Sequence, residues 1–179
     1  MEISIIATWF ANISSSFSVE RYRNYLYISL EDSIMENKYP KLYLISDDIS
    51  KIIDTVKEQE NVIFAGLYFG FIKKGKFYIS LEGAEFLYKH KIISNFKKLH
   101  INNKGEKSIL YGNDISKNMI VESPTVLKKD DFLVIFNMLN EIIALGRSAI
   151  DKEDIQILEP NKIIAINLVD KGSYLRKRQ

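Results

Sequence analysis

The sequence predicts an α/β (α+β) N-terminal domain followed by a C-terminal domain of short strands that form a small mixed-strand pseudo-β-barrel. Strand-like runs alternate with two helical patterns over residues 22–88. No long helical period follows residue 92, where short apolar runs are separated by polar turns. The 179 residues, 46% of them hydrophobic, suffice for two small cores. We therefore expect domains at residues 1–95 and 96–179.

The predicted N-terminal domain begins with strands and a helix. The uncharged residues 3–19 are expected to form an edge strand and a serine-rich turn rather than a signal peptide, because the only charge before them is acidic. Residues 22–30 alternate with the strand period of two, and residues 41–45 form another strand. Ser46 then caps a helix whose apolar residues recur at i, i+3, i+4 and i+7. These residues are Ile49, Ile52, Ile53 and Val56.

A β-hairpin and a second helix complete this domain. Residues 62–72 are predicted to form a long strand that bends at its glycines, and Lys74-Gly75 turns the chain into a strand at residues 76–79. Ser80 is expected to cap the helix that follows, from residue 81 to about residue 88.

The predicted C-terminal domain is organised around residues 108–120. A strand-like apolar run ends there at Gly112, which tolerates the positive φ of a sharp bend. Asn113 and Asp114 are expected to start a short helical turn through residues 116–117. Further strands are predicted at residues 97–101, 132–136, 142–146 and 163–166, with a turn at 102–105.

Composition excludes several kinds of chemistry. The chain has no cysteine, which rules out disulfides and thiolate metal sites, and its two histidines are too few for a metal site without carboxylates. A glycine-rich phosphate loop, a nucleophile elbow and the zinc-protease motif are all missing from the sequence. We therefore expect no nucleophilic or zinc chemistry, no cofactor and no metal.

Positive charge gathers in the second half of the sequence. Residues 91–179 carry 15 basic and 11 acidic side chains, and residues 73–107 hold nine lysines and three acids with aromatic residues between them. Basic groups among aromatics suit a phosphate backbone and stacked bases. The alternative is a solvated lysine face over an aromatic core, which is common in proteins.

Three motifs resemble the Nip-seven family of ribosome-biogenesis factors. They are SILYGN at residues 108–113, LG at 145–146 and DKGSYLR at 170–176, and the resemblance extends over most of the chain from residue 41. It implies that the C-terminal barrel is a PUA domain, the RNA-binding module named after pseudouridine synthase and archaeosine transglycosylase. It also implies a non-catalytic role in ribosomal RNA processing and large-subunit assembly. The composition fits an archaeal source, hence a cytoplasmic protein, or a nucleolar one in a eukaryote.

Six residues of the barrel are predicted to contact RNA: Tyr111, Lys117, Arg147, Lys152, Lys162 and Arg176. Arg147 is the leading candidate because it ends a strand just past Gly146, and its alternative role is a surface ion pair with Asp151 or Glu153. The family often has basic residues in the loop at 154–160, where this chain is acidic.

Two rival functions remain open, with no role for a membrane in any of them. One is the accessory half of an RNA-modifying enzyme, since such enzymes carry the same barrel. The other is an adaptor in an assembly or RNA-decay complex that acts mainly through protein contacts, with the apolar residues 132–138 or the uncharged N-terminus meeting the partner.

Overall fold

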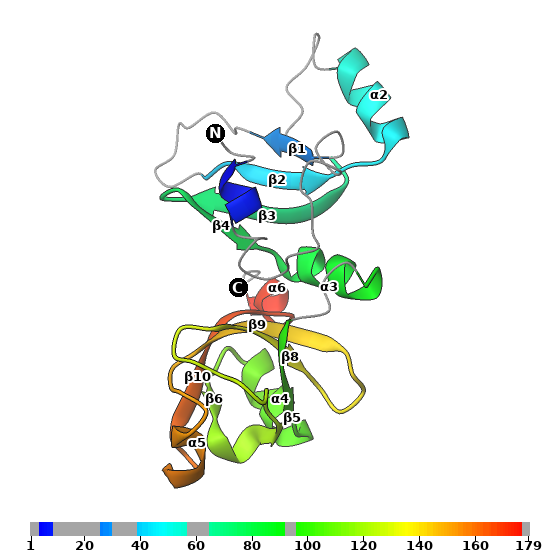
Figure 1. Cartoon of the computed structure of the whole chain (residues 1–179). Coiled ribbons are helices and arrows are strands. Elements are labelled where there is room, and N and C mark those ends of the chain that lie inside the picture. Colours follow the sequence, from blue (N-terminus) through cyan, green and yellow to red (C-terminus); the bar gives the residue numbers. More distant parts are fainter. Residues whose placement is uncertain (1–3, 9–25, 30–38, 57–64, 92–95, 177–179) are drawn as a thin grey trace. The chain divides into compact units, whose positions relative to one another are not determined.

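A computed structural model describes residues 4–8, 26–29, 39–56, 65–91 and 96–176 (Figure 1). The chain divides into two compact units, Met1–Asn95 and Phe96–Gln179, and each unit contains one sheet. None of the helices in the described ranges combines the length and the apolar character needed to span a membrane.

The N-terminal unit contains a four-stranded antiparallel sheet in the order β1-β2-β3-β4. Its strands are β1 (Leu26–Ser29), β2 (Lys41–Leu44), β3 (Leu67–Lys73) and β4 (Lys76–Ile79). The predicted hairpin is confirmed, because Lys74 and Gly75 both adopt positive φ, at 50° and 68°, in the turn between β3 and β4. Part of the strand predicted at residues 62–72 lies outside the described residues.

Two helices of this unit lie where the sequence places them. Helix α2 (Asp47–Val56) follows Ser46, but of its apolar stripe only Ile53 is fully buried, and Ile52 is 61% exposed. Helix α3 (Leu81–Lys89) is capped as predicted, because the Ser80 hydroxyl accepts a hydrogen bond of 2.9 Å from the amide of Gly83.

The predicted N-terminal edge strand is wrong where the structure describes it. Residues 4–8 are helical, and the Thr8 hydroxyl donates to the carbonyl of Ser4 at 2.9 Å. Ile6 is completely buried. A run without charge fits a buried helical turn as well as an edge strand, so the lack of charge did not decide between them. The rest of that run lies outside the described residues.

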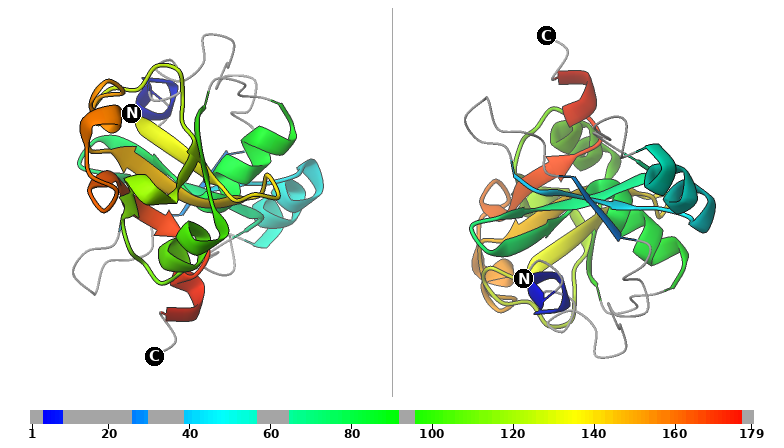
Figure 2. Two further views of the ribbon diagram at one scale, coloured as in Figure 1. Left: turned by 90° about the horizontal axis from the view of Figure 1, so that it is seen from below. Right: turned by 90° about the horizontal axis from the view of Figure 1, so that it is seen from above.

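The C-terminal unit contains a six-stranded mixed sheet in the order β6-β10-β9-β8-β5-β7. Its strands are β5 (Lys97–Ile101), β6 (Ile115–Ser116), β7 (Ile120–Glu122), β8 (Phe132–Phe136), β9 (Ile142–Ser148) and β10 (Ile163–Asp170). Strands β5 and β8 are parallel, and the other pairs are antiparallel. The strongly curved sheet (Figure 2) surrounds a core that includes Leu99, Ile101, Leu133, Ile135 and Ile164. The strands predicted in this part of the sequence are therefore confirmed, apart from the one that ends at Gly112.

Helix α4 (Asn103–Leu110) replaces the turn predicted at 102–105 and the strand that was expected to follow it. The side chain of Asn102 caps the helix by accepting from the amide of Gly105 at 2.8 Å. Gly105 is fully buried, and a Cβ atom there would lie 2.7 Å from Met119. This glycine therefore marks close packing of a helix rather than a turn.

The bend predicted at Gly112 is confirmed, but it ends a helix. Gly112 has a φ of +92°, and its amide donates to the carbonyl of Ile109 at 2.7 Å. The amide of Asn113 donates to Ser108 at 3.2 Å, which completes the usual glycine C-cap. The remaining short elements are the 3-10 helix η2 (Lys117–Met119), α5 (Asp154–Ile157) and α6 (Ser173–Arg176).

Candidate nucleic-acid interface

The six predicted RNA-contact residues lie at two ends of strand β10. Lys162 immediately precedes this strand, the amide of Lys117 donates to the carbonyl of Lys162, and Arg147 pairs with Ile166 in the first half of the strand. Lys152 follows Ala149, whose amide donates to the carbonyl of Ile164. Tyr111 and Arg176 lie near its last residue, Asp170. An eight-residue strand spans about 23 Å, so the candidates form two groups rather than one site. We call these places the Ile163 end and the Asp170 end.

Two lysines at the Ile163 end are used by the protein itself. The ammonium of Lys117 donates to the carbonyls of Gln156 and Leu158, at 2.9 and 2.6 Å, and so closes the C-terminal end of α5. The ammonium of Lys152 donates to the hydroxyl of Ser123. Both lysines therefore fasten a loop to the barrel.

Arg147 and Lys162 are the accessible cations among the candidates at this end. Arg147 is about half exposed and forms an ion pair of 2.9 Å with Asp130, rather than with Asp151 or Glu153. Asp130 reaches it because its own amide donates to the carbonyl of Ser148 at 2.9 Å. Lys162 is exposed, and its ammonium has no partner among the residues that the structure describes.

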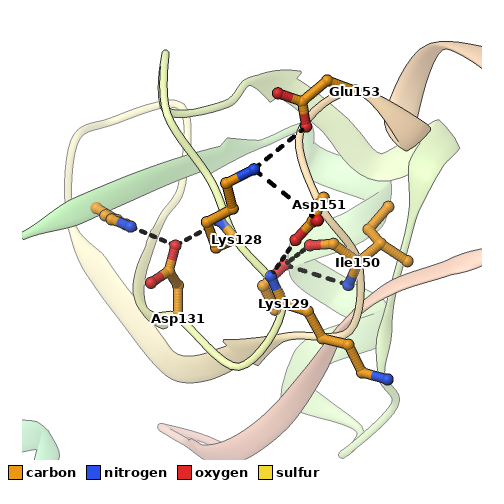
Figure 3. A network of polar contacts seen from close by, with 8 residues as sticks. Lys128, Lys129, Asp131, Ile150, Asp151 and Glu153 are labelled. Atoms are coloured by element: carbon orange, nitrogen blue, oxygen red, sulfur yellow. Dashed lines mark hydrogen bonds and ion pairs between the residues drawn. The ribbon is translucent and has the colours of Figure 1, made fainter.

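Lysines and carboxylates of residues 128–131 and 150–153 form a polar network (Figure 3). Lys128 lies 3.9 Å from both Asp151 and Glu153, and the amide of Lys129 donates to Asp151 at 2.6 Å. The side chain of Lys129 points away from this network (Figure 3). The acidic side chains of this network, together with the partner of Arg147, are Asp130, Asp131, Asp151 and Glu153. They offset much of the positive charge that phosphate binding needs.

Arg176 is fixed at the Asp170 end by the protein. Its guanidinium donates two hydrogen bonds to the carboxylate of Asp170, at 2.8 and 3.1 Å, and a third to the carbonyl of Leu110. Asp170 is 2% exposed. The hydrogen bond with Asp170 raises the pKa of Arg176 above its ordinary value. Arg176 therefore joins the C-terminal segment to the end of α4.

An exposed stripe on α4 combines cations with an aromatic ring. Lys104, Lys107 and Tyr111 are spaced i, i+3 and i+7, so they lie along one side of the helix. All three are exposed, and Tyr111 is 79% exposed. The one acid of α4, Glu106, instead accepts a hydrogen bond of 3.0 Å from the side-chain amide of Asn137. We call these three residues the α4 stripe.

Sequence reasoning identified Tyr111 but missed Lys104 and Lys107 as candidates. Their helical spacing is hidden in the sequence because the asparagines and the glycine of residues 102–105 are typical of a turn. The available signal was Asn102 followed by helix-favouring lysine and glutamate residues, which is typical of a capped helix start.

The two histidines of the chain lie apart, one in each unit. Those residues contain no cluster of three or more His, Cys, Asp or Glu side chains that could hold a metal ion. His90 ends α3, with its Nδ1 atom 2.9 Å from the carbonyl of Phe86. His100 lies on β5, with its Nε2 atom 3.2 Å from the Oδ1 atom of Asn140. Both rings thus have structural contacts.

Comparison with known families identifies the C-terminal unit. Residues 97–179 match the family described as the UPF0113 PUA domain. A UPF0113 protein of Archaeoglobus fulgidus is 28% identical over 131 residues, which cover 73% of this chain and 72% of the relative. The 60S ribosome subunit biogenesis proteins of Schizosaccharomyces pombe and Saccharomyces cerevisiae, named nip7 and NIP7, are 26% and 27% identical. Each of these two alignments covers 76% of this chain and 73% of the relative. The resemblance to the Nip-seven family is therefore confirmed.

Solved structures show the same fold over nearly the whole chain. A hypothetical protein from the hyperthermophilic archaeon Pyrococcus horikoshii has a TM-score of 0.59 and 11% identity, with 95% of this chain and 92% of that chain covered. A conserved PUA domain protein from Thermoplasma acidophilum has a TM-score of 0.56 and 15% identity, with 89% of each chain covered. The predicted fold, an α/β unit followed by a PUA barrel, is confirmed.

Proposed function

We propose that this chain, whose residues 97–179 form a PUA domain of the UPF0113 family, is a non-catalytic RNA-binding factor in ribosomal RNA processing and large-subunit assembly. The relatives named as 60S ribosome subunit biogenesis proteins support this role, because they align with about three quarters of both chains. The protein would act where large subunits are assembled, in the cytoplasm of an archaeal cell or the nucleolus of a eukaryotic one.

The observation that carries the proposal is the α4 stripe. Two lysines and an exposed aromatic ring on one side of a helix match what a single-stranded RNA offers, phosphates and unstacked bases. Lys104 and Lys107 would contact phosphates, and a base would stack on Tyr111. The neighbouring acids Glu106 and Asp170 are both engaged in hydrogen bonds with Asn137 and Arg176, rather than with the lysines of the stripe.

Arg147 and Lys162 form a weaker, second contact in this proposal. Both side chains are accessible, yet the carboxylates of the Ile163 end reduce their attraction for phosphate. Lys117, Lys152 and Arg176 have structural roles instead, because their hydrogen bonds with the protein would have to break before they touched RNA.

Cross-linking in cells, followed by sequencing of the attached RNA, tests this function. We expect fragments of the large-subunit ribosomal RNA precursor, and attachment to transfer RNA alone would contradict the assignment. Incubation of the purified chain with these RNAs, followed by nucleoside analysis, separates a binding factor from an RNA-modifying enzyme. A binding factor leaves the nucleosides and the RNA length unchanged.

A protein-contact role is favoured by one observation in the C-terminal unit. Met138 and Leu139, in the turn between β8 and β9, are 54% and 77% exposed. Adjacent exposed apolar side chains are typical of contact with another protein. Copurification before and after nuclease treatment distinguishes direct contact, which survives the nuclease, from partners that are joined only through RNA.

A further inference from the structure

The sheet of the N-terminal unit has two different faces. Phe77 and Ile79 of β4 are buried on one face, where Gly83 of α3 packs closely against Ile79. The other face carries Lys41, Phe71 and Tyr78, which stand directly opposite one another across β2, β3 and β4. In the next row of this face, Lys73 is paired with Lys76.

Aromatic rings on this second face are arranged as a platform. The rings of Phe71 and Tyr78 are stacked, with centroids 5.1 Å apart and planes at 10°. Tyr39 extends the row, with its centroid 6.1 Å from that of Phe71. Tyr78 is 40% exposed, and Phe71 is partly exposed. Three adjacent aromatic rings in one row, with Tyr78 at its exposed end, offer a flat apolar surface on which a planar ligand can stack.

Two lysines of β3 and β4 lie beside the platform, on the side away from Tyr43, where the same face packs against Ile53 of α2. The ammonium of Lys73 lies over the Tyr39 ring, 4.7 Å from its centroid, and Lys76 is exposed beside Tyr78. Neither residues 39–46 nor residues 65–81 include an acidic side chain. The strands that form this face therefore contribute lysines and no carboxylates, in contrast to the Ile163 end of the other unit. We call Tyr39, Lys41, Phe71, Lys73, Lys76 and Tyr78 the aromatic sheet face.

We propose that the aromatic sheet face is a second binding site for single-stranded RNA, in the unit that has no PUA domain. A base would stack on the outer face of the Tyr78 ring, whose other face is stacked on Phe71, and the lysines beside it would contact the phosphates. The face suits a polynucleotide better than an acidic peptide, because it combines an exposed ring with lysines. A polynucleotide has both bases that stack on the ring and phosphates that attract the lysines, whereas an acidic peptide offers only the negative charge. The choice of RNA over single-stranded DNA rests on the proposed function, whereas the location of the site does not.

Photo-crosslinking to the full chain tests this site. A uridine oligonucleotide that carries 5-iodouridine should attach to tryptic peptide 77–89, which contains Tyr78. The attachment should disappear in Tyr78→Ala and return in Tyr78→Phe, because the phenyl ring is what stacks. The same attachment should persist in the triple variant Lys104→Glu, Lys107→Glu, Tyr111→Ala, which disables the proposed PUA site. Cross-links to residues 96–176 report on the proposed function, and cross-links to residues 39–80 report on this inference.

Affinity measurements supply the second readout. Lys76→Glu in the triple-variant background should weaken binding of the oligonucleotide about fivefold or more. Lys51→Glu, an exposed lysine of α2 in the same unit, is the matched control and should have a much smaller effect. Cross-links confined to residues 96–176, together with equal affinities of the Lys76→Glu and Lys51→Glu variants, would overturn the proposal. Retention of the far-ultraviolet circular dichroism spectrum shows that each variant is folded.

Discussion

The guanidinium of Arg176 forms a two-point hydrogen bond with the buried carboxylate of Asp170, at 2.8 and 3.1 Å. The same guanidinium donates to the carbonyl of Leu110, and it lies 3.1 Å from where a Cβ atom on Gly112 would be. One arginine near the end of the chain thus holds the turn that follows α4. Since Tyr111 lies in that turn, Arg176 is expected to position the ring without touching RNA.

The first prediction compares two aspartates that pair with arginines. Asp170→Asn should weaken RNA binding about tenfold, because the loosened turn no longer presents Tyr111 for stacking. Asp130→Asn should strengthen binding up to about threefold, because it frees the exposed Arg147 and removes a carboxylate. Fluorescence anisotropy with a labelled single-stranded RNA measures both constants.

A double-mutant cycle controls this comparison. In a Tyr111→Ala background, Asp170→Asn should have little further effect on affinity, because the ring that it positions is gone. If instead Asp170→Asn strengthens binding as Asp130→Asn does, Arg176 is a direct phosphate ligand and the positioning role is wrong.

A second prediction concerns the packing of the C-terminal segment on α4. Gly172→Ala should lower the free energy of unfolding of the C-terminal unit by about 1–3 kcal/mol, because its Cβ atom would overlap the carbonyl of Leu110. Gly75→Ala is the control: that glycine has a φ of +68° but nothing within 4 Å of an added Cβ atom. The loss of unfolding free energy caused by Gly75→Ala should be confined to the N-terminal unit. Urea unfolding followed by amide hydrogen exchange measures this loss for each unit. Equal protection of the C-terminal amides in wild type and Gly172→Ala would refute the packing argument.

A third prediction concerns stability at high pH. Burial raises the pKa of Tyr68 to about 12, and negative charge on Tyr43 and Glu82 adds to the rise. The folded unit therefore retains a proton that the unfolded chain loses near pH 10, so this contribution to stability is complete below pH 10 and is lost as the pH rises toward 12. Thermal unfolding from pH 9 to pH 12 should show a smaller loss of stability in Tyr68→Phe than in wild type. An equal loss of stability with pH in wild type and Tyr68→Phe would contradict this role of Tyr68.

Local sequence signals predicted most of the fold. The capped helix at Ser80 and the Lys74-Gly75 hairpin depend on residues close in sequence, and both are confirmed. Helix α4 was missed because Gly105 was interpreted as a turn residue. The reason for that glycine is its contact with Met119, fourteen positions along the chain, which no local pattern reveals.

Distant contacts also explain why the site was only partly predictable. Tyr111, which the sequence predicts to contact RNA, is exposed. Lys117 and Arg176 carry the same prediction, yet both are hydrogen-bonded within the protein. Their partners are the carbonyl of Leu158 and that of Leu110, which are brought near only when the barrel closes. Charges that looked available for phosphate are therefore used to hold the chain together.

The most direct test of RNA binding by the PUA domain is a filter-binding titration of single-stranded RNA over a range of salt concentrations. Affinity for wild type should fall steeply with salt, and Lys104→Glu with Lys107→Glu should weaken binding at least tenfold and reduce the slope of log K against log salt by about 1.4. Arg147→Glu with Lys162→Glu should weaken it by a smaller factor. Wild-type affinity in both double variants at low salt would contradict the account.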